Sequence, residues 1–201
     1  AASRASLNDN RFDNDGQGGW FLERDSLTLL SWLEAFDANP VNASTGVMAF
    51  NTTAAANSFT FLRKLLDSAC AWTSKTASPG EVFSQRRALF FSGSLKNLPA
   101  QERIQVLNKS VDQWSLLAYP AEGHSPTILT DGLDGAILRG KPAEQLASWL
   151  FLRWLLLPRS QATLASASAT LPVRTSALGL MADYGKAHPQ WAAIAQTQAA
   201  L

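Results

Sequence analysis

A short apolar run, Ala88 to Phe91, constrains the fold of this chain more than any other stretch. Two arginines precede it and Ser92-Gly93-Ser94 follows it. An apolar run of this length between polar breakers is typical of a buried strand that ends in a tight loop. Such a loop offers hydroxyls and backbone N–H groups to whatever lies above the strand end. The residues therefore predict either a core strand with an ordinary turn or the floor of a ligand cleft.

Apolar residues at helical spacing predict helices on both sides of this strand. Asp25 or Ser26 can cap the first helix, and Pro99 suits the first turn of another. The helix that ends near Leu157 is apolar nearly all round, so we expect it to be well buried. Helices are expected at roughly 26–36, 53–68, 81–87, 99–107, 144–157, 159–167 and 176–185, with another after Pro189.

Two further strands are expected in the second half of the chain. The run from Trp114 to Ala118 is typical of a strand stopped by a following proline. Gly132 and Gly135 indicate a bend that enters a buried strand from Ala136 to Leu138. Strands interleaved with helices predict an α/β fold in which helices cover a small sheet.

Composition excludes some classes of protein. The 201 residues carry a formal net charge of +1, and they include no basic stripe that could neutralise phosphates, so a nucleic-acid partner is not expected. The longest apolar run, 149–157, contains Arg153 and falls far short of the ~20 residues that span a bilayer. Cys70 is the single cysteine, so it has no partner for an internal disulfide.

Few residues are arranged for chemistry. Asp131 and Asp134 could form a glycosidase pair, because two carboxylates can act as general acid and nucleophile, but they need not face each other and turn formation explains them better. A calcium loop at residues 11–22 fails, because Arg11 and Leu22 stand where acidic ligands are required. A catalytic thiol at Cys70 would need a histidine partner. We expect neither a cofactor nor a metal.

The order of these segments resembles the sugar- and oligosaccharide-binding branch of the extracellular solute-binding proteins of ABC importers. Gly19-Trp20 before a Trp-bearing helix is similar to a segment early in the second lobe of that family. The resemblance continues through most of the chain, in order: Phe50-Asn51-Thr52, the helix ending at 67–72, Phe83 to Ser94, Trp114 to Pro120, 131–137, the helix 144–157, 158–161 and Leu171-Pro172-Val173-Arg174.

This resemblance implies an α/β fold like that of periplasmic binding proteins, which close two lobes on a solute. The family is about twice as long, so the resemblance implies an incomplete two-lobed architecture. Residues 1–126 would be the ligand-binding region of the second lobe, 127–176 a return segment to the first lobe, and 177–201 helices near the hinge. We also expect homodimers through the exposed return segment, because large apolar patches favour association.

The implied function is non-catalytic capture of a sugar-like solute for a membrane permease. The protein would be exported to the periplasm or the cell surface, where a lipid could anchor its precursor. Aromatic faces, hydroxyls and carboxylates at strand ends suit sugar binding. The candidate ligand-binding residues are Trp20, Ser92, Ser94, Gly132 and Asp134.

Two alternatives from other classes remain open. One is a glycoside hydrolase fragment that uses Asp131 and Asp134. The other is a structural or interaction domain without a ligand. Turnover of a reporter glycoside would distinguish the enzyme from the capture protein.

Overall fold

The computed structural model describes residues 18–200, except 43, 122–125, 127, 131 and 133, with side chains to residue 197. The chain divides into two compact units. The first holds the residues up to Ser94 together with Ala100–Asp112 and Ala118–Leu129. The second holds Leu95–Pro99, Gln113–Leu117 and the residues from Thr130 onward. Each unit is described by itself.

The first unit is built on a three-stranded parallel sheet with the order β2 (Ala71–Trp72), β1 (Gly18–Phe21), β3 (Ala88–Phe91). The predicted strand at 88–91 is therefore confirmed, but the central strand is β1. The expectation that β3 is buried is wrong: Leu89 and Phe90 are 49% and 44% exposed. The reason is that β3 is an edge strand of the described sheet and is covered less completely than β1.

Close packing explains the glycine that opens β1. A Cβ atom built on Gly18 would come within 2.9 Å of Cδ1 in the side chain of Trp72, which belongs to β2. Glycine therefore lets β1 lie directly against the Trp72 indole. The strands β1 and β2 were not expected from the local sequence. β2 has only two residues, and both strands are defined by pairing with segments that are distant along the chain.

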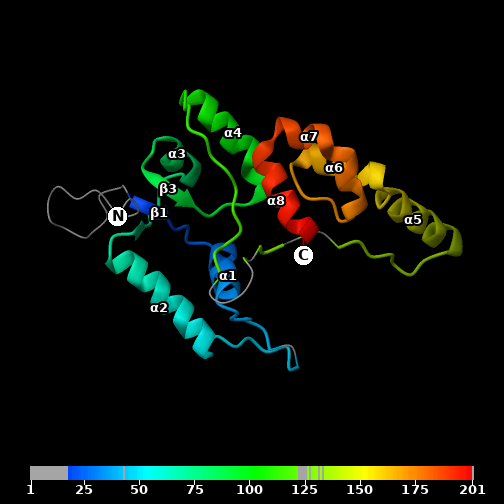
Figure 1. The fold of residues 1–201 in the computed structure, drawn as a ribbon. Helices are drawn as coiled ribbons and strands as arrows, with labels where there is room; N and C mark the ends of the chain where they lie inside the picture. The colour runs from blue at the N-terminus through cyan, green and yellow to red at the C-terminus, as the bar shows by residue number, and fades with distance from the viewer. Residues whose placement is uncertain are drawn as a thin grey trace. The chain divides into compact units, whose positions relative to one another are not determined.

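Helices cover both faces of the sheet (Figure 1). On one face, Trp20 and Leu22 pack with Trp32 of α1 (Ser26–Ala35) and with leucines of α2 (Thr53–Asp67). On the other, Phe21 packs edge-on against Trp72, with ring centroids 4.8 Å apart, and beside Val82 of α3 (Pro79–Ser84). This arrangement confirms the α/β class.

The helix boundaries follow from capping. The Asp25 carboxylate accepts hydrogen bonds from the backbone N–H groups of Leu27 and Thr28, both at 2.9 Å, so α1 begins where the sequence predicts. The Thr52 hydroxyl oxygen accepts from the Ala55 N–H in the same way. The expected helix at 81–87 instead begins at Pro79 and ends at Ser84.

The second unit is almost entirely helical. Its core combines Leu98, the first residue of α4 (Leu98–Leu107), with α6 (Pro158–Ser168), the 3-10 helix η2 (Thr175–Met181) and α8 (Pro189–Ala200). The Trp191 indole lies in this core and donates to the Thr170 carbonyl at 3.0 Å. The remaining elements are η1 (Leu95–Asn97), α5 (Pro142–Leu155) and α7 (Ala182–Ala187). The expected helix at 176–185 is thus η2 followed by α7.

Three expectations about the second half are wrong. Residues 114–118 form no strand, and 136–138 form no strand and are exposed. The helix α5 forms as predicted, but none of its residues is buried. A strand needs a partner strand and a buried apolar helix needs a facing surface; within the second unit these segments find no partner strand, and α5 makes only partial contacts.

Candidate functional site

A group of aromatic rings and hydroxyls gathers on the α1 side of the sheet in the first unit. We call it the aromatic–hydroxyl cluster. Its members come from β1, α1, the end of β3 and the segment that enters the first unit at Ala118. They are Trp20, Trp32, Phe90 and Tyr119 with the hydroxyl residues Thr28, Ser31 and Ser92.

The rings contact one another closely. The ring centroid of Trp20 lies 5.0 Å from that of Trp32 and 5.4 Å from that of Phe90, its neighbour across the β1–β3 pair. Tyr119 stands edge-on to Trp32 at 5.3 Å and lies 6.3 Å from Trp20. Because Phe90 is 44% exposed, the cluster reaches the protein surface along β3.

The hydroxyls surround the Tyr119 phenol. Thr28 and Ser31 lie on the first turns of α1, and Ser92 follows β3 directly; all three side chains are buried. The pKa of Tyr119 is raised, and burial of the phenol is the largest cause. Interactions with the hydroxyls of Ser92, Thr28 and Ser31 lower this pKa, but they do not outweigh burial. The phenol therefore stays neutral and can donate or accept a hydrogen bond.

Buried polar atoms in this cluster lack partners. The indole nitrogens of Trp20 and Trp32 have no hydrogen-bond partner among the described residues. Leaving such a group unpaired costs about 1–3 kcal/mol. Two of them in rings that contact Tyr119 mark a place where solute oxygen atoms could form the missing hydrogen bonds.

The position within the fold also suits a ligand. Ser92 lies just beyond the carboxyl end of β3, and α1 begins five residues beyond β1 at Ser26. Ligands of open α/β sheets bind at the carboxyl ends of the strands. The cluster therefore combines the usual location with apolar faces and hydroxyl groups.

The structure brings two of the predicted ligand-binding residues together and separates others. Trp20 and Ser92 both belong to the cluster, while Ser94 is exposed at the end of the same loop. Gly132 and Asp134 are exposed in the second unit, and Asp131 lies outside the described residues. The assignment of all five residues to a ligand site stays a prediction.

Sequence reasoning missed Tyr119, the residue on which the hydroxyls converge. It was interpreted only as the stop of a strand, and Trp32 and Phe90 only as apolar residues of their elements. The one available signal was the Tyr119-Pro120 pair itself, because a residue before proline favours an extended backbone.

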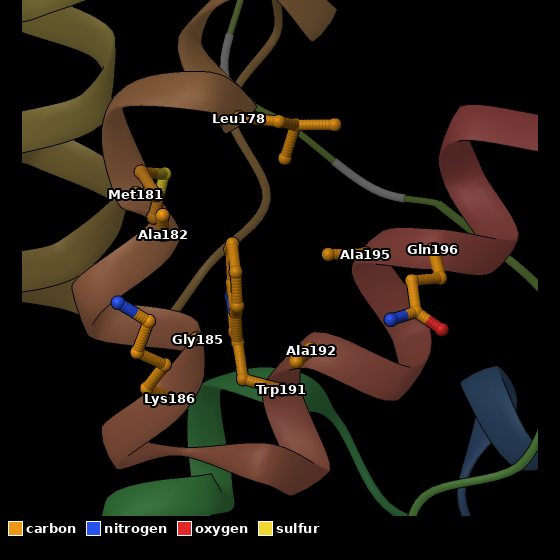
Figure 2. Close-up of a pocket in the computed structure, with 9 residues that line it drawn as sticks. All are labelled: Leu178, Met181, Ala182, Gly185, Lys186, Trp191, Ala192, Ala195 and Gln196. Atoms are coloured by element: carbon orange, nitrogen blue, oxygen red, sulfur yellow. The ribbon is translucent and has the colours of Figure 1, made fainter.

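An open hollow occurs in the second unit. Figure 2 shows the Trp191 indole in its middle, with Met181 and Ala182 on one side and Ala195 on the other. The lining is mostly apolar, the indole N–H is already bonded to Thr170, and Lys186 pairs with Asp183 at 2.9 Å. It offers fewer free polar groups than the cluster and is the weaker candidate for a hydroxylated solute.

Other site types have less support in the described part of the chain. No cluster of three or more potential metal-ligating side chains occurs among the described residues. Residues 11–17 of the segment 11–22, considered above for calcium, lie outside them. None of the described helices combines the length and the apolar character needed to cross a bilayer.

Comparison with known proteins places the chain in a family. The model of the bacterial extracellular solute-binding protein family matches residues 10–193, most of the 201-residue chain. The matched range includes every residue of the aromatic–hydroxyl cluster. A comparison with curated proteins finds no match. The fold, the cluster at the strand ends and the extent of the family match lead to one conclusion: this chain belongs to the bacterial extracellular solute-binding proteins.

Proposed function

We propose that this protein captures a sugar or an oligosaccharide and delivers it to an ABC permease. The observation that carries the proposal is the aromatic–hydroxyl cluster, in which a buried neutral phenol lies among buried hydroxyls and contacts two indole rings whose N–H groups have no partner among the described residues. Sugars present apolar faces that stack on aromatic rings and hydroxyls that both donate and accept hydrogen bonds. The cluster offers both kinds of group.

The affinity expected from the cluster alone is modest. One aromatic contact and one or two hydrogen bonds supply on the order of 2–5 kcal/mol. A micromolar dissociation constant requires about 8 kcal/mol. Further contacts must supply the difference, and we propose Ser94, Gly132 and Asp134 among them. A carboxylate such as Asp134 can accept two sugar hydroxyls in charge-assisted hydrogen bonds.

We propose that the chain corresponds to the second lobe of a two-lobed binding protein and to the segment that returns to the first. Family membership supports export to the periplasm or cell surface and the absence of catalysis. Lipid anchoring of the precursor belongs to the same proposal. Hydrolysis of a reporter glycoside by the purified protein would instead favour the glycosidase alternative.

Calorimetry against a panel of neutral disaccharides tests the ligand site. Trp20→Ala should weaken binding of the best ligand at least tenfold, because it removes a stacking face and an indole N–H together. Trp20→Phe keeps an aromatic ring and should weaken binding less. This variant still tests the site if the alanine variant unfolds. Phe59→Ala, an exposed aromatic change on α2 outside the cluster, is the matched control.

Asp134→Asn is measured in the same titrations. It should weaken binding severalfold if the carboxylate accepts sugar hydroxyls. Should Trp20→Phe and Asp134→Asn both leave affinity within twofold of the wild type, the proposed site is misplaced. Should no disaccharide bind, the sugar assignment fails while membership of the solute-binding family stands.

We also propose that α5 mediates association with a second copy of the chain. Its side chains Trp149, Leu150, Phe151 and Trp154 are 48–57% exposed. Large apolar patches of this kind mark interaction surfaces. Light scattering at tens of micromolar should detect a dimer, and Trp154→Glu should reduce it to a monomer. A monomer in the wild type would contradict this part of the proposal.

A further inference from the structure

We propose that Asp25 makes the aromatic–hydroxyl cluster select uncharged solutes over anionic ones. The inference rests on the proposed function only in taking this cluster as the solute site. It goes further because it names the charge class of the solute and the residue that sets it. The argument depends on how the N-terminus of α1 is used.

A helix N-terminus normally attracts anions through its free N–H groups and its dipole. In α1 these groups are already occupied, because the Asp25 carboxylate accepts hydrogen bonds from Leu27 N–H and Thr28 N–H at 2.9 Å each. Thr28 also contributes the hydroxyl that acts on Tyr119. The end of α1 that faces the cluster therefore carries a fixed carboxylate where an anion would otherwise bind.

The charges on the neighbouring residues act in the same direction. The negative charge of Asp25 contributes to the raised pKa of Tyr119. Glu23 adds a second carboxylate close to Asp25. Partial burial, followed by repulsion from Asp25, raises the pKa of Glu23. The intervening cation, Arg24, donates from Nε to the Thr73 hydroxyl oxygen at 2.9 Å, so it is engaged at the end of β2. Arg87 lies over the Trp72 ring, and Trp72 packs on the other face of the sheet.

The hydroxyls suit a neutral solute. Tyr119, Thr28, Ser31 and Ser92 all carry groups that can donate and accept, which matches the alternating donors and acceptors of a polyol. A carboxylate group on the solute offers acceptors only, so it would use only the donor capacity of these groups. It would also approach the Asp25 carboxylate, while the adjacent described cation, Arg24, donates to Thr73 instead.

The experiment compares a neutral disaccharide with the matched disaccharide that carries a uronate, each titrated into wild type, Asp25→Asn and Glu34→Gln. Asparagine caps a helix as well as aspartate does, so Asp25→Asn removes the charge and keeps the cap. Glu34→Gln removes a charge near the other end of the same helix, about 13 Å away along its axis, and serves as the control.

We expect wild-type protein at low ionic strength to bind the neutral ligand at least tenfold more tightly than the uronate. Asp25→Asn should reduce this ratio at least threefold, and Glu34→Gln should leave it unchanged. Equal binding of the two ligands by the wild type overturns the inference, as does an unchanged ratio in Asp25→Asn. Either result leaves the proposed function intact, whereas failure of both ligands to bind overturns the proposed function.

A second readout needs no ligand. Tyr119 and Tyr184 are the only tyrosines of the chain, so in a Tyr184→Phe background the phenolate absorbance reports Tyr119 alone. Asp25→Asn should lower the pKa of Tyr119, because removing a nearby negative charge favours the phenolate. An unchanged titration would show that Asp25 does not act on the cluster and would overturn the inference even if no sugar binds.

Discussion

Helices α1 and α5 are both apolar and tryptophan-bearing, yet the protein uses them differently. In α1, Trp32 is 1% exposed and Leu33 is fully buried. In α5, Trp149 and Trp154 are 48% and 56% exposed, and no residue is buried. The difference is what lies opposite: α1 packs on the sheet and on α2, while α5 has only partial contacts such as that between Leu152 and the Gly135 position. Apolar spacing predicts a helix, but burial needs a facing surface.

The largest expected effect comes from truncating one tryptophan of each helix. Trp32→Ala should destabilise the first unit by about 3–5 kcal/mol, because it removes a fully buried ring that contacts Trp20, Phe61 and Tyr119. At a protein concentration low enough for the chain to be monomeric, Trp154→Ala should change stability by no more than about 0.5 kcal/mol, as exposed substitutions usually do. Chemical denaturation followed by circular dichroism measures both. Similar losses from the two variants would abolish the contrast between the helices.

Removing the N-terminal cap of each helix should have a smaller effect. Asp25→Ala should cost about 1 kcal/mol, because Leu27 N–H and Thr28 N–H lose their acceptor. The corresponding change in α5, Glu144→Ala, removes one longer hydrogen bond from Lys141 N–H at 3.2 Å, and it should cost less. Hydrogen exchange within each helix separates the two effects. A greater loss from Glu144→Ala would contradict the ranking.

The contribution of Asp25 should also depend on pH. Partial burial raises the pKa of this carboxyl, but hydrogen bonds from Thr28 and Leu27 outweigh burial and hold it below its ordinary value. The stabilisation is therefore fully present above the unfolded pKa of about 3.9 and is lost as pH falls through the folded-state pKa. Asp25→Asn should lose this part of the pH dependence. Parallel stability curves for wild type and Asp25→Asn from pH 2 to pH 6 would refute the assignment.

The smallest expected effect comes from removing one serine hydroxyl in each region. One hydroxyl forms a hydrogen bond between two helices, and the other forms a hydrogen bond within a single helix. Ser58 of α2 is fully buried and donates to the Trp32 carbonyl of α1 at 3.2 Å. Ser58→Ala should cost about 0.5–1.5 kcal/mol. Ser148 of α5 is exposed and donates to the Glu144 carbonyl of the same helix, so Ser148→Ala should be close to neutral. Denaturation midpoints give both values, and equal losses would weaken the comparison.

Local patterns predicted the helices well and the sheet poorly. The cap at Asp25 and the first-turn proline at 99 each mark a helix start that the structure confirms. The strand at 88–91 was also predicted, because four apolar residues stand between clear breakers. The strand β1 was missed and two strands in the second half were wrongly expected, because strand identity depends on hydrogen bonds to segments that are distant in sequence.

The residues of the candidate site also differ in whether the local sequence could predict them. Trp20 and Ser92 could be proposed from the sequence, because glycines and a strand end indicate side chains presented at an edge. Tyr119 could not: it joins the cluster only because the chain, after Leu117, returns from the second unit to the first.

What the sequence by itself determined was the α/β class, most helices and the order of segments that matches the solute-binding family. Those properties follow from short-range spacing, capping and turn residues. Only the tertiary structure decided that β1 is central, that α5 is exposed, and that Trp20, Ser92 and Tyr119 meet beside the capped end of α1. Burial and unpartnered polar atoms are properties of surfaces in contact, and no local pattern specifies which surfaces those are.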